Sequence, residues 1–176
     1  MTIIAYDGKN VCVDEQFNSN DIASSGVKFQ ITKKGELLLF TGSVDLGTAK
    51  MVWYEKGAKA KSFPKANDRA DDADVADLIV FHRTGGPTVY YQQPIPVPEP
   101  GAPAAWGAGA PVAMGVMLSG KTAMEAIEIA FAVNTSCGIG YATFNRSPDG
   151  IWEMVSRKKC KMVFDDVKIK KPRRRK

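Results

Sequence analysis

The spacing of short apolar runs and turn sequences is the feature that most limits how this chain can fold. The first two runs lie on either side of residues 7–10, Asp-Gly-Lys-Asn, a turn sequence typical of a β-hairpin. Three pairs of runs have this form, at residues 3–6 with 11–13, 27–31 with 36–40, and 78–81 with 88–91. Helical patterns stand between these pairs in blocks. This order predicts an α+β fold of two antiparallel sheets packed face to face with helices outside, and it argues against a doubly wound parallel sheet.

The alternation of side chains within the runs indicates which faces are buried. Apolar and polar residues alternate at 27–31, which predicts a half-buried strand with Lys28 on the side opposite the apolar residues. The run at 36–40 is short and largely apolar, as in a strand covered on both faces. Residues 17–26 are polar and predict a loop between the first two hairpins.

Three segments have helical patterns, at residues 44–56, at 110–118, and after Thr122. The first has four candidates for its inner face: Val44, Ala49, Val52 and Trp53. The third begins with the capping box Thr122-Ala-Met-Glu125. Its apolar positions follow the i, i+3, i+4, i+7 rule: Ala123, Ala126, Ile127, Ala130 and Phe131.

The segments between these elements are less regular. Residues 58–77 are charged and small, which predicts a looser helix or a surface excursion. Five prolines between 94 and 103 predict an extended connector. The last strands are expected at 141–144, 151–155 and 161–163.

Composition is typical of a single globular domain, which we assign to residues 1–167. A chain of 176 residues with 44% hydrophobic content can bury one sizeable core. No apolar stretch is long enough for a membrane span and no basic region precedes one, so we expect a cytoplasmic protein without membrane association. The three cysteines lack CxxC spacing and are expected to be reduced thiols, without a disulfide, metal or cofactor: Cys12, Cys137 and Cys160. The one histidine, His82, excludes mechanisms that need two and is interpreted as a packed or edge residue.

Positive charge is concentrated at the C-terminal end. Residues 168–176, from Lys168 to Lys176, hold seven of the 24 basic residues and no acidic one, and the remainder carries 17 basic against 19 acidic residues. This run, interrupted by Pro172, is interpreted as a disordered, solvated tail. The alternative is a salt-sensitive contact with nucleic-acid phosphates.

The strongest chemical signal lies at the N-terminus. Removal of Met1 would give Thr2 a free α-amine beside its own hydroxyl, at the head of an apolar run. That amine has a reference pKa of about 7.7–8.0, so it can accept the hydroxyl proton near neutral pH, and one residue then supplies both nucleophile and general base. The alternative is that Thr2 is merely the first residue of a strand.

Several short segments, taken in order, resemble the proteasome β-subunit family. They are Met-Thr-Ile-Ile-Ala-Tyr at the start, Asp14, Val27-Lys28, Phe40-Thr-Gly-Ser-Val-Asp45, Gly107-Ala-Gly109 and Ser136-Cys-Gly138. Their order and spacing, from Thr2 to about Tyr141, are most similar to the HslV-type peptidase subunits and their bacteriophage-encoded relatives, which are N-terminal nucleophile (Ntn) hydrolases. The resemblance implies a four-layer αββα sandwich, in agreement with the block order of the sequence.

The resemblance also implies roles for four residues. Thr2 matches the N-terminal threonine nucleophile of the family, and Asp14 matches the buried aspartate that orients a lysine, here Lys28. An ammonium close to the threonine hydroxyl would favour its alkoxide. Gly42 matches the glycine whose backbone N–H serves as oxyanion donor, where the absence of a side chain lets the substrate carbonyl approach. Without the family, Asp14 and Lys28 would be ordinary strand-surface residues and Gly42 an ordinary turn.

Three departures from the family concern residues that support this site. Where the family often has Gly-Ser-Gly, this chain has Ala108 between two glycines, so a hydroxyl that assists the terminal amine is missing. Where proteasome subunits have an aspartate and, three residues later, a serine, this chain has Asn134 and Cys137. The amide removes a negative charge that would support a protonated amine or lysine.

Two functions therefore remain open. The first is a threonine-type peptidase; the resemblance implies a homo-oligomeric ring and an ATP-dependent unfoldase partner, and the chain itself has no phosphate-binding loop. The second is a structural or interaction protein that kept the sandwich and lost the chemistry, with the basic tail contacting nucleic acid, for example in a phage particle. Its place would then be the host cytoplasm or the virion.

Overall fold

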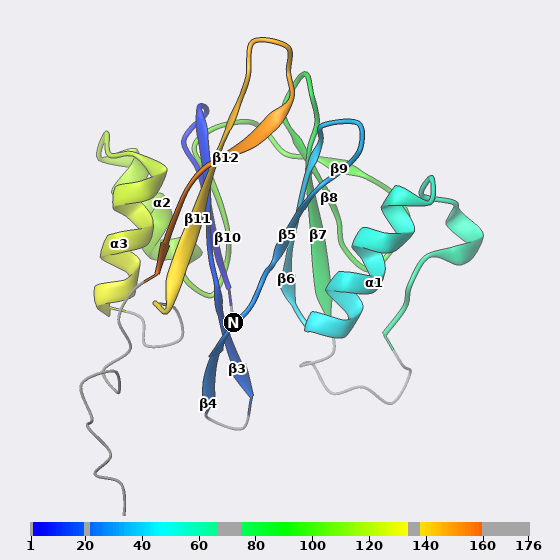
Figure 1. The fold of residues 1–176 in the computed structure, drawn as a ribbon, viewed down its shortest axis with the longest axis horizontal. Helices are drawn as coiled ribbons and strands as arrows, with labels where there is room; N and C mark the ends of the chain where they lie inside the picture. Colours follow the sequence, from blue (N-terminus) through cyan, green and yellow to red (C-terminus); the bar gives the residue numbers. More distant parts are fainter. Residues whose placement is uncertain (1, 20–21, 67–74, 134–137, 160–176) are drawn as a thin grey trace, which may run out of the picture.

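The computed structural model describes residues 2–19, 22–66, 75–133 and 138–159. Two five-stranded antiparallel sheets face each other (Figure 1). The first sheet contains, in spatial order, β10 (Ala104–Gly107), β1 (Ile3–Tyr6), β2 (Asn10–Asp14), β11 (Gly140–Arg146) and β12 (Trp152–Lys159). The second contains β5 (Phe29–Ile31), β6 (Leu37–Gly42), β7 (Ala76–Phe81), β8 (Pro87–Tyr90) and β9 (Val97–Pro98). The fold thus has the predicted pair of antiparallel sheets.

Helices cover the outer faces of both sheets. The helices α2 (Ala110–Leu118) and α3 (Ala123–Val133) lie against the first sheet, and α1 (Val44–Glu55) lies against the second (Figure 1). A short 3₁₀ helix, η1 (Ala60–Ser62), follows α1. No helix within the described residues is long and apolar enough to cross a membrane.

The period-two alternation of the strands divides the core into three layers of side chains. Between the sheets lie side chains of both, among them Ile4, Val11, Val13, Leu37, Leu39, Ile79, Phe144 and Trp152. The opposite face of β1 and β2 packs on α2 and α3 through Ile3, Ala5 and Cys12. The opposite face of β6 and β7 packs on α1 through Leu38, Phe40, Leu78 and Val80. Both faces of β6 are therefore covered, which confirms the prediction made from its apolar run.

The N-terminus of α3 has the predicted capping box. The Thr122 hydroxyl accepts the N–H of Glu125 at 3.2 Å, and the Glu125 carboxylate accepts the N–H of Thr122 at 2.9 Å. A third group, the carboxylate of Asp7, accepts the N–H of Ala123 at 2.9 Å from the turn between β1 and β2. No local sequence pattern indicates this long-range cap.

Three predictions about local structure are wrong. The faces assigned to residues 27–31 are reversed, because Lys28 is wholly buried whereas Val27 and Ile31 are exposed. Residues 17–26 are not a simple loop, because β3 (Gln16–Ser19) and β4 (Ile22–Ser25) form a hairpin of their own that projects from one end of the sandwich (Figure 1). The predicted inner face of α1 is also wrong: Val44, Ala49 and Val52 are exposed, and of the predicted set only Trp53 is buried. The residues that α1 buries are Gly47, Lys50, Met51 and Trp53.

The physical reason for the error in α1 is the close approach of the helix to the sheet. A Cβ atom on Gly47 would lie 2.3 Å from the ring of Phe40, so a residue without a side chain is needed there. Lys50 is wholly buried, which a hydrophobic pattern cannot reveal.

The less regular segments agree in part with expectation. Between 58 and 77, the described residues contain only η1 and the start of β7. The proline-rich connector is extended and adds β9 to the edge of β8. The strand predicted at 151–155 is β12, which is longer and reaches Lys159. The strand predicted at 161–163 lies outside the described residues.

Candidate active site

Thr2 immediately precedes β1, and the N-terminal end of the chain lies at the end of the sandwich from which β3 and β4 project (Figure 1). Its side chain is almost fully buried, and its hydroxyl has no hydrogen-bond partner among the described residues. A buried hydroxyl without a partner costs free energy, so native proteins keep few of them without a functional reason. The missing partner makes this oxygen a candidate for a functional role.

Two glycines allow the neighbouring segment to approach the start of β1. A Cβ atom on Gly107, which has a φ of +89°, would lie 2.1 Å from the carbonyl oxygen of Thr2. A Cβ atom on Gly109 would lie 2.6 Å from Cδ1 of Ile3. Ala108, at the position of the missing hydroxyl, lies between them and is exposed.

Asp14, the last residue of β2, connects the backbone beside Thr2 to a buried cation. Its Oδ1 atom accepts the N–H of Ile3 at 2.8 Å and the ammonium of Lys28 at 3.0 Å. Its Oδ2 atom accepts the N–H of Gln16 at 3.2 Å. Burial raises the pKa of the Asp14 carboxyl, and the charge of Lys28 and the donated hydrogen bonds oppose that rise.

Lys28 lies immediately before β5 and, like Asp14, has no exposed side-chain surface. Its ammonium also lies 4.9 Å from the centre of the Phe17 ring, which belongs to β3. The interpretation of Asp14 and Lys28 as strand-surface residues is therefore wrong. Both are buried in one ion pair at the point where β2, β3 and β5 meet.

Gly42 ends β6 with a φ of +86°, a conformation that favours glycine. A Cβ atom here would lie 2.1 Å from the carbonyl oxygen of Val75, which accepts the N–H of Ser43 at 2.8 Å. The N–H of Phe40 donates to the carbonyl of Lys28. Because N–H groups alternate along a strand, the N–H of Gly42 points to the same side of β6.

The structure thus brings three of the four predicted site residues into one connected group. Asp14 contacts Lys28 directly and holds the peptide that joins Thr2 to Ile3. Gly42 lies two residues beyond the backbone contact between Phe40 and Lys28. Two of the supporting positions, Asn134 and Cys137, lie outside the described residues.

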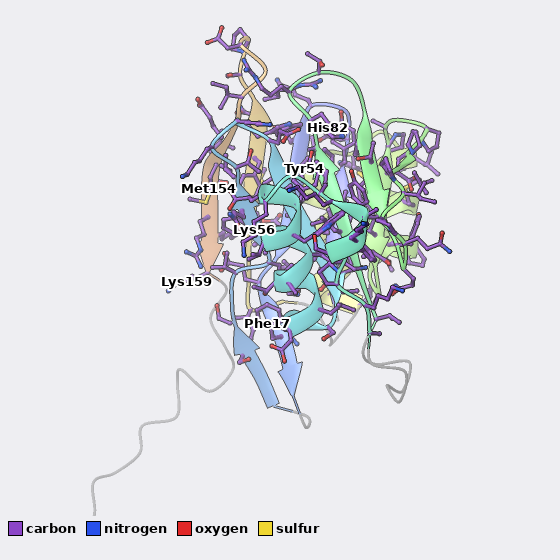
Figure 2. All side chains as sticks on the ribbon, turned by 90° about the vertical axis from the view of Figure 1, so that its right-hand side faces the viewer. Phe17, Tyr54, Lys56, His82, Met154 and Lys159 are labelled. Carbon is purple, nitrogen blue, oxygen red and sulfur yellow. The ribbon has the colours of Figure 1, made fainter. Side chains whose placement is uncertain are left out.

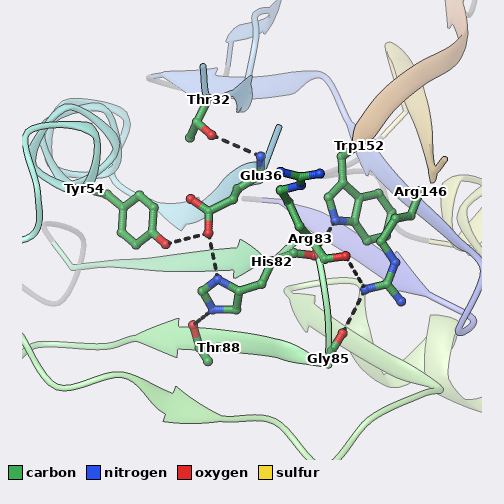
Figure 3. Close-up of polar contacts among 9 residues, drawn as sticks. All are labelled: Thr32, Glu36, Tyr54, His82, Arg83, Gly85, Thr88, Arg146 and Trp152. Atoms are coloured by element: carbon green, nitrogen blue, oxygen red, sulfur yellow. Dashed lines mark hydrogen bonds and ion pairs between the residues drawn. The ribbon is translucent and has the colours of Figure 1, made fainter. Parts of the chain in front are cut away.

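The sequence did not reveal a polar cluster at the other end of α1 (Figure 3). One oxygen of Glu36 accepts the Tyr54 hydroxyl at 3.1 Å and lies 2.9 Å from Nδ1 of His82, whose Nε2 lies 2.9 Å from the Thr88 hydroxyl. Cavities of about 620 and 720 Å³ flank Glu36. Figure 2 shows Phe17 and His82 at opposite ends of α1, so this cluster is separate from the Thr2 site. Its members are far apart in the chain, and the lone histidine was the only available signal.

Among the residues that the structure describes, the remaining reactive groups lack the geometry of a site. Cys12 is buried, and burial raises the pKa of its thiol to about 12, which keeps it protonated and unreactive. Within the described residues, no three side chains of the metal-binding types lie together.

Comparisons with known proteins concern the fold of the chain. No family model and no curated protein matches the chain. Among solved structures, a eukaryotic HslV from Trypanosoma brucei matches with 20% identity and a TM-score of 0.57, covering 81% of this chain and 96% of its own. Anbu from Hyphomicrobium sp. strain MC1 matches with 12% identity and a TM-score of 0.58, and a mutant of it with 11% and 0.60; both cover 90% of this chain and 86% of their own. The chain shares the fold of HslV and Anbu.

Proposed function

We propose that this chain is a threonine-type peptidase in which Thr2, after removal of Met1, is the N-terminal nucleophile. One observation carries the proposal: a single oxygen of Asp14 binds both the buried ammonium of Lys28 and the N–H of Ile3, the residue after Thr2, whose own hydroxyl has no hydrogen-bond partner among the described residues. An ion pair that only stabilised the fold would have no need to bind the peptide between Thr2 and Ile3, whereas an N-terminal nucleophile would gain from a cation held close to it.

The reaction would proceed through an acyl-enzyme. The free amine of Thr2 takes the hydroxyl proton while Oγ1 attacks the substrate carbonyl, and the N–H of Gly42 donates to the oxyanion that forms. The C–N bond then breaks, and the leaving amine receives the proton held by the Thr2 amine. Water attacks the Thr2 ester in the same way, which releases the second product and restores the free hydroxyl.

Lys28 and Asp14 act on the nucleophile without entering the covalent steps. The ammonium of Lys28 lowers the free energy of the Thr2 alkoxide, an effect that is strong where water is excluded. Asp14 holds that ammonium in place and fixes the peptide beside Thr2.

A second candidate function is a structural or interaction protein with the same fold, such as a component of a phage particle. Ala108 favours it, because the family's serine hydroxyl at this position would assist the Thr2 amine. In that case the buried ion pair would be a remnant that now serves stability alone.

The decisive experiment combines intact mass with a covalent probe. Mass spectrometry of the purified protein should show loss of Met1, and an epoxyketone probe should then add its mass to Thr2. The variant Thr2→Ala should take up no probe, and Thr2→Ser, which keeps amine and hydroxyl, should retain labelling. Retention of Met1, or a folded wild type without adduct, would reject the peptidase and support the structural function.

We further propose that the chain works as a homo-oligomer, as its resemblance to ring-forming subunits implies. Several large apolar side chains on the helices are strongly exposed in the single chain, including Leu118 and Val133 at about two thirds of their surface. Burial of such residues between copies would lower the free energy of the assembly. Sedimentation should give a mass several times that of one chain, and a monomer at micromolar concentration would contradict this. An ATP-dependent unfoldase would then be sought as a partner by co-purification.

A further inference from the structure

The side chain of Lys50, on the inner face of α1, is wholly buried and plays no part in the proposed chemistry. Its ammonium donates to the carbonyl oxygens of Ala76 and Tyr91 and lies 5.0 Å from the centre of the Phe63 ring. Ala76 is the first residue of β7, and Tyr91 immediately follows β8. One cation therefore connects a helix to the ends of two strands.

A buried lysine is an energetically unfavourable way to connect a helix to two strands. Burial of an ammonium costs several kcal/mol unless other groups replace its water. Burial lowers the pKa of Lys50 to about 8, and the carboxylate of Asp77 opposes this shift. The fold keeps this residue where a leucine or methionine would fill the same space between α1 and the sheet.

The start of β7, which Lys50 binds, is also the segment that pairs with β6 at Gly42. In the pairing of β6 with β7, Gly42 lies opposite Ala76, and the preceding carbonyl, that of Val75, accepts the N–H of Ser43. The pairing alternates, so the carbonyl of Ala76 points away from β6 and towards Lys50 and the side-chain amide of Gln92.

The end of β6 depends on β7 for its position. The strand β5 pairs with β6 only as far as Leu39, through Phe29. The N–H of Phe40 still donates to Lys28, but beyond Phe40 the one described strand that pairs with β6 at Gly42 is β7. A shift at the start of β7 would therefore move Gly42 directly.

We propose that Lys50 is a positioning residue for the oxyanion donor: by tying Ala76 and Tyr91 to α1, it fixes β7, the strand that pairs with the end of β6 on the side opposite to the N–H of Gly42. The role of Gly42 in this inference rests on the proposed peptidase function. The role of Lys50 in holding β7 against β6 does not. An oxyanion donor must be held closely in place to act, because a displacement of about 1 Å can cost about a hundredfold in rate.

The test compares Lys50→Met with Lys56→Met, the same change at an exposed position just after the same helix. Hydrogen exchange followed by mass spectrometry should show amides at 41–43 and 75–77 exchanging about tenfold faster in Lys50→Met, with β1, β2 and α3 unchanged. Labelling of Thr2 by the epoxyketone should be about tenfold slower, and kcat for a peptide substrate should fall with KM nearly constant. Lys56→Met should match the wild type in each measurement. If Lys50→Met does not fold, Lys50→Gln, which keeps a donor for one carbonyl, is measured in the same way.

Each outcome decides the inference. Unchanged exchange at 41–43 and 75–77, or faster exchange spread evenly over the molecule, would overturn it and leave Lys50 as a general stabilising residue. Local exchange with unchanged labelling would overturn the link to Gly42. A wild type that takes up no probe would reject the peptidase, while the exchange pattern would still decide whether Lys50 holds the end of β6.

Discussion

The carboxylate of Asp14 accepts three hydrogen bonds, and one of its donors is the fully buried ammonium of Lys28. We predict that Asp14→Ala lowers the free energy of unfolding by about 3–5 kcal/mol, because it leaves that ammonium buried without its counter-charge. The double variant Asp14→Ala with Lys28→Met should recover much of the loss, since no unpaired charge remains. Urea denaturation measures both.

An exposed ion pair is the matched control. The carboxylate of Glu128 pairs with Lys158 at the surface, and Glu128→Gln should change the free energy of unfolding by less than about 1 kcal/mol. If the double variant were as unstable as Asp14→Ala, the loss would come from the backbone hydrogen bonds of Asp14 and not from the stranded ammonium.

The buried amine of Lys50 makes stability depend on pH in the alkaline range. Burial lowers its pKa from 10.5 to about 8, so between these values the unfolded chain holds a proton that the folded chain has lost. Stability therefore rises with pH there, and we predict a gain on the order of 2 kcal/mol for the wild type relative to Lys50→Met. Asp77, the charged group that acts on this amine, is present in both proteins. Denaturation at pH 8 and at pH 10 tests the difference, and parallel curves would show that the amine is not desolvated.

At the scale of elements, the N-terminus of α3 is held by its own capping box and by Asp7 from the first hairpin. Burial raises the pKa of Asp7, but hydrogen bonds from the N–H groups of Ala123, Asn10 and Lys9 outweigh it, and the net pKa is lowered below 3.8. We predict that Asp7→Ala reduces the free energy of unfolding by about 1–2 kcal/mol at neutral pH. The advantage of the wild type should be complete above pH 3.8 and fade as the pH falls through the lowered pKa. Acid titration of both proteins by circular dichroism measures this, and a difference that stayed constant down to pH 2 would contradict it.

In α3, the local features could be predicted from the sequence and the long-range contact could not. Its start was readable because the capping box is local, with Thr122 and Glu125 three residues apart, and its inner face follows a helical period. The cap by Asp7 was not readable, because it joins residues 116 positions apart. For α1 the period itself misled, since Gly47 and Lys50 face the sheet where a pattern search expects large apolar residues.

The same distinction between local pattern and long-range contact applies to the candidate site. The resemblance named Thr2, Asp14, Lys28 and Gly42, but without it Lys28 reads as a solvated residue on a polar strand face. Only the arrangement of β2, β3 and β5 shows that this face is closed. The glycines at 107 and 109 became interpretable once the carbonyl of Thr2 and the side chain of Ile3 were seen beside them.

At the scale of the whole molecule, charge separates the chain into two parts. The last nine residues hold seven of its 24 basic residues, and without them the chain has 17 basic and 19 acidic residues, which turns a net charge of +5 slightly negative. A body of that charge has little long-range attraction for a polyanion. Any affinity for nucleic acid must then come from the tail.

We therefore predict that removal of residues 168–176 abolishes retention on duplex DNA and leaves the far-ultraviolet circular dichroism spectrum unchanged. For the full chain, the logarithm of affinity should fall with the logarithm of salt concentration with a slope of up to about −6, because each phosphate contact contributes about −0.9. The control is Lys33→Gln with Lys34→Gln, which removes two exposed charges from the turn before β6 and should shift this slope little. Equal retention with and without the tail would assign DNA binding to the folded body, and no retention by the full chain would leave the tail as a solvated extension.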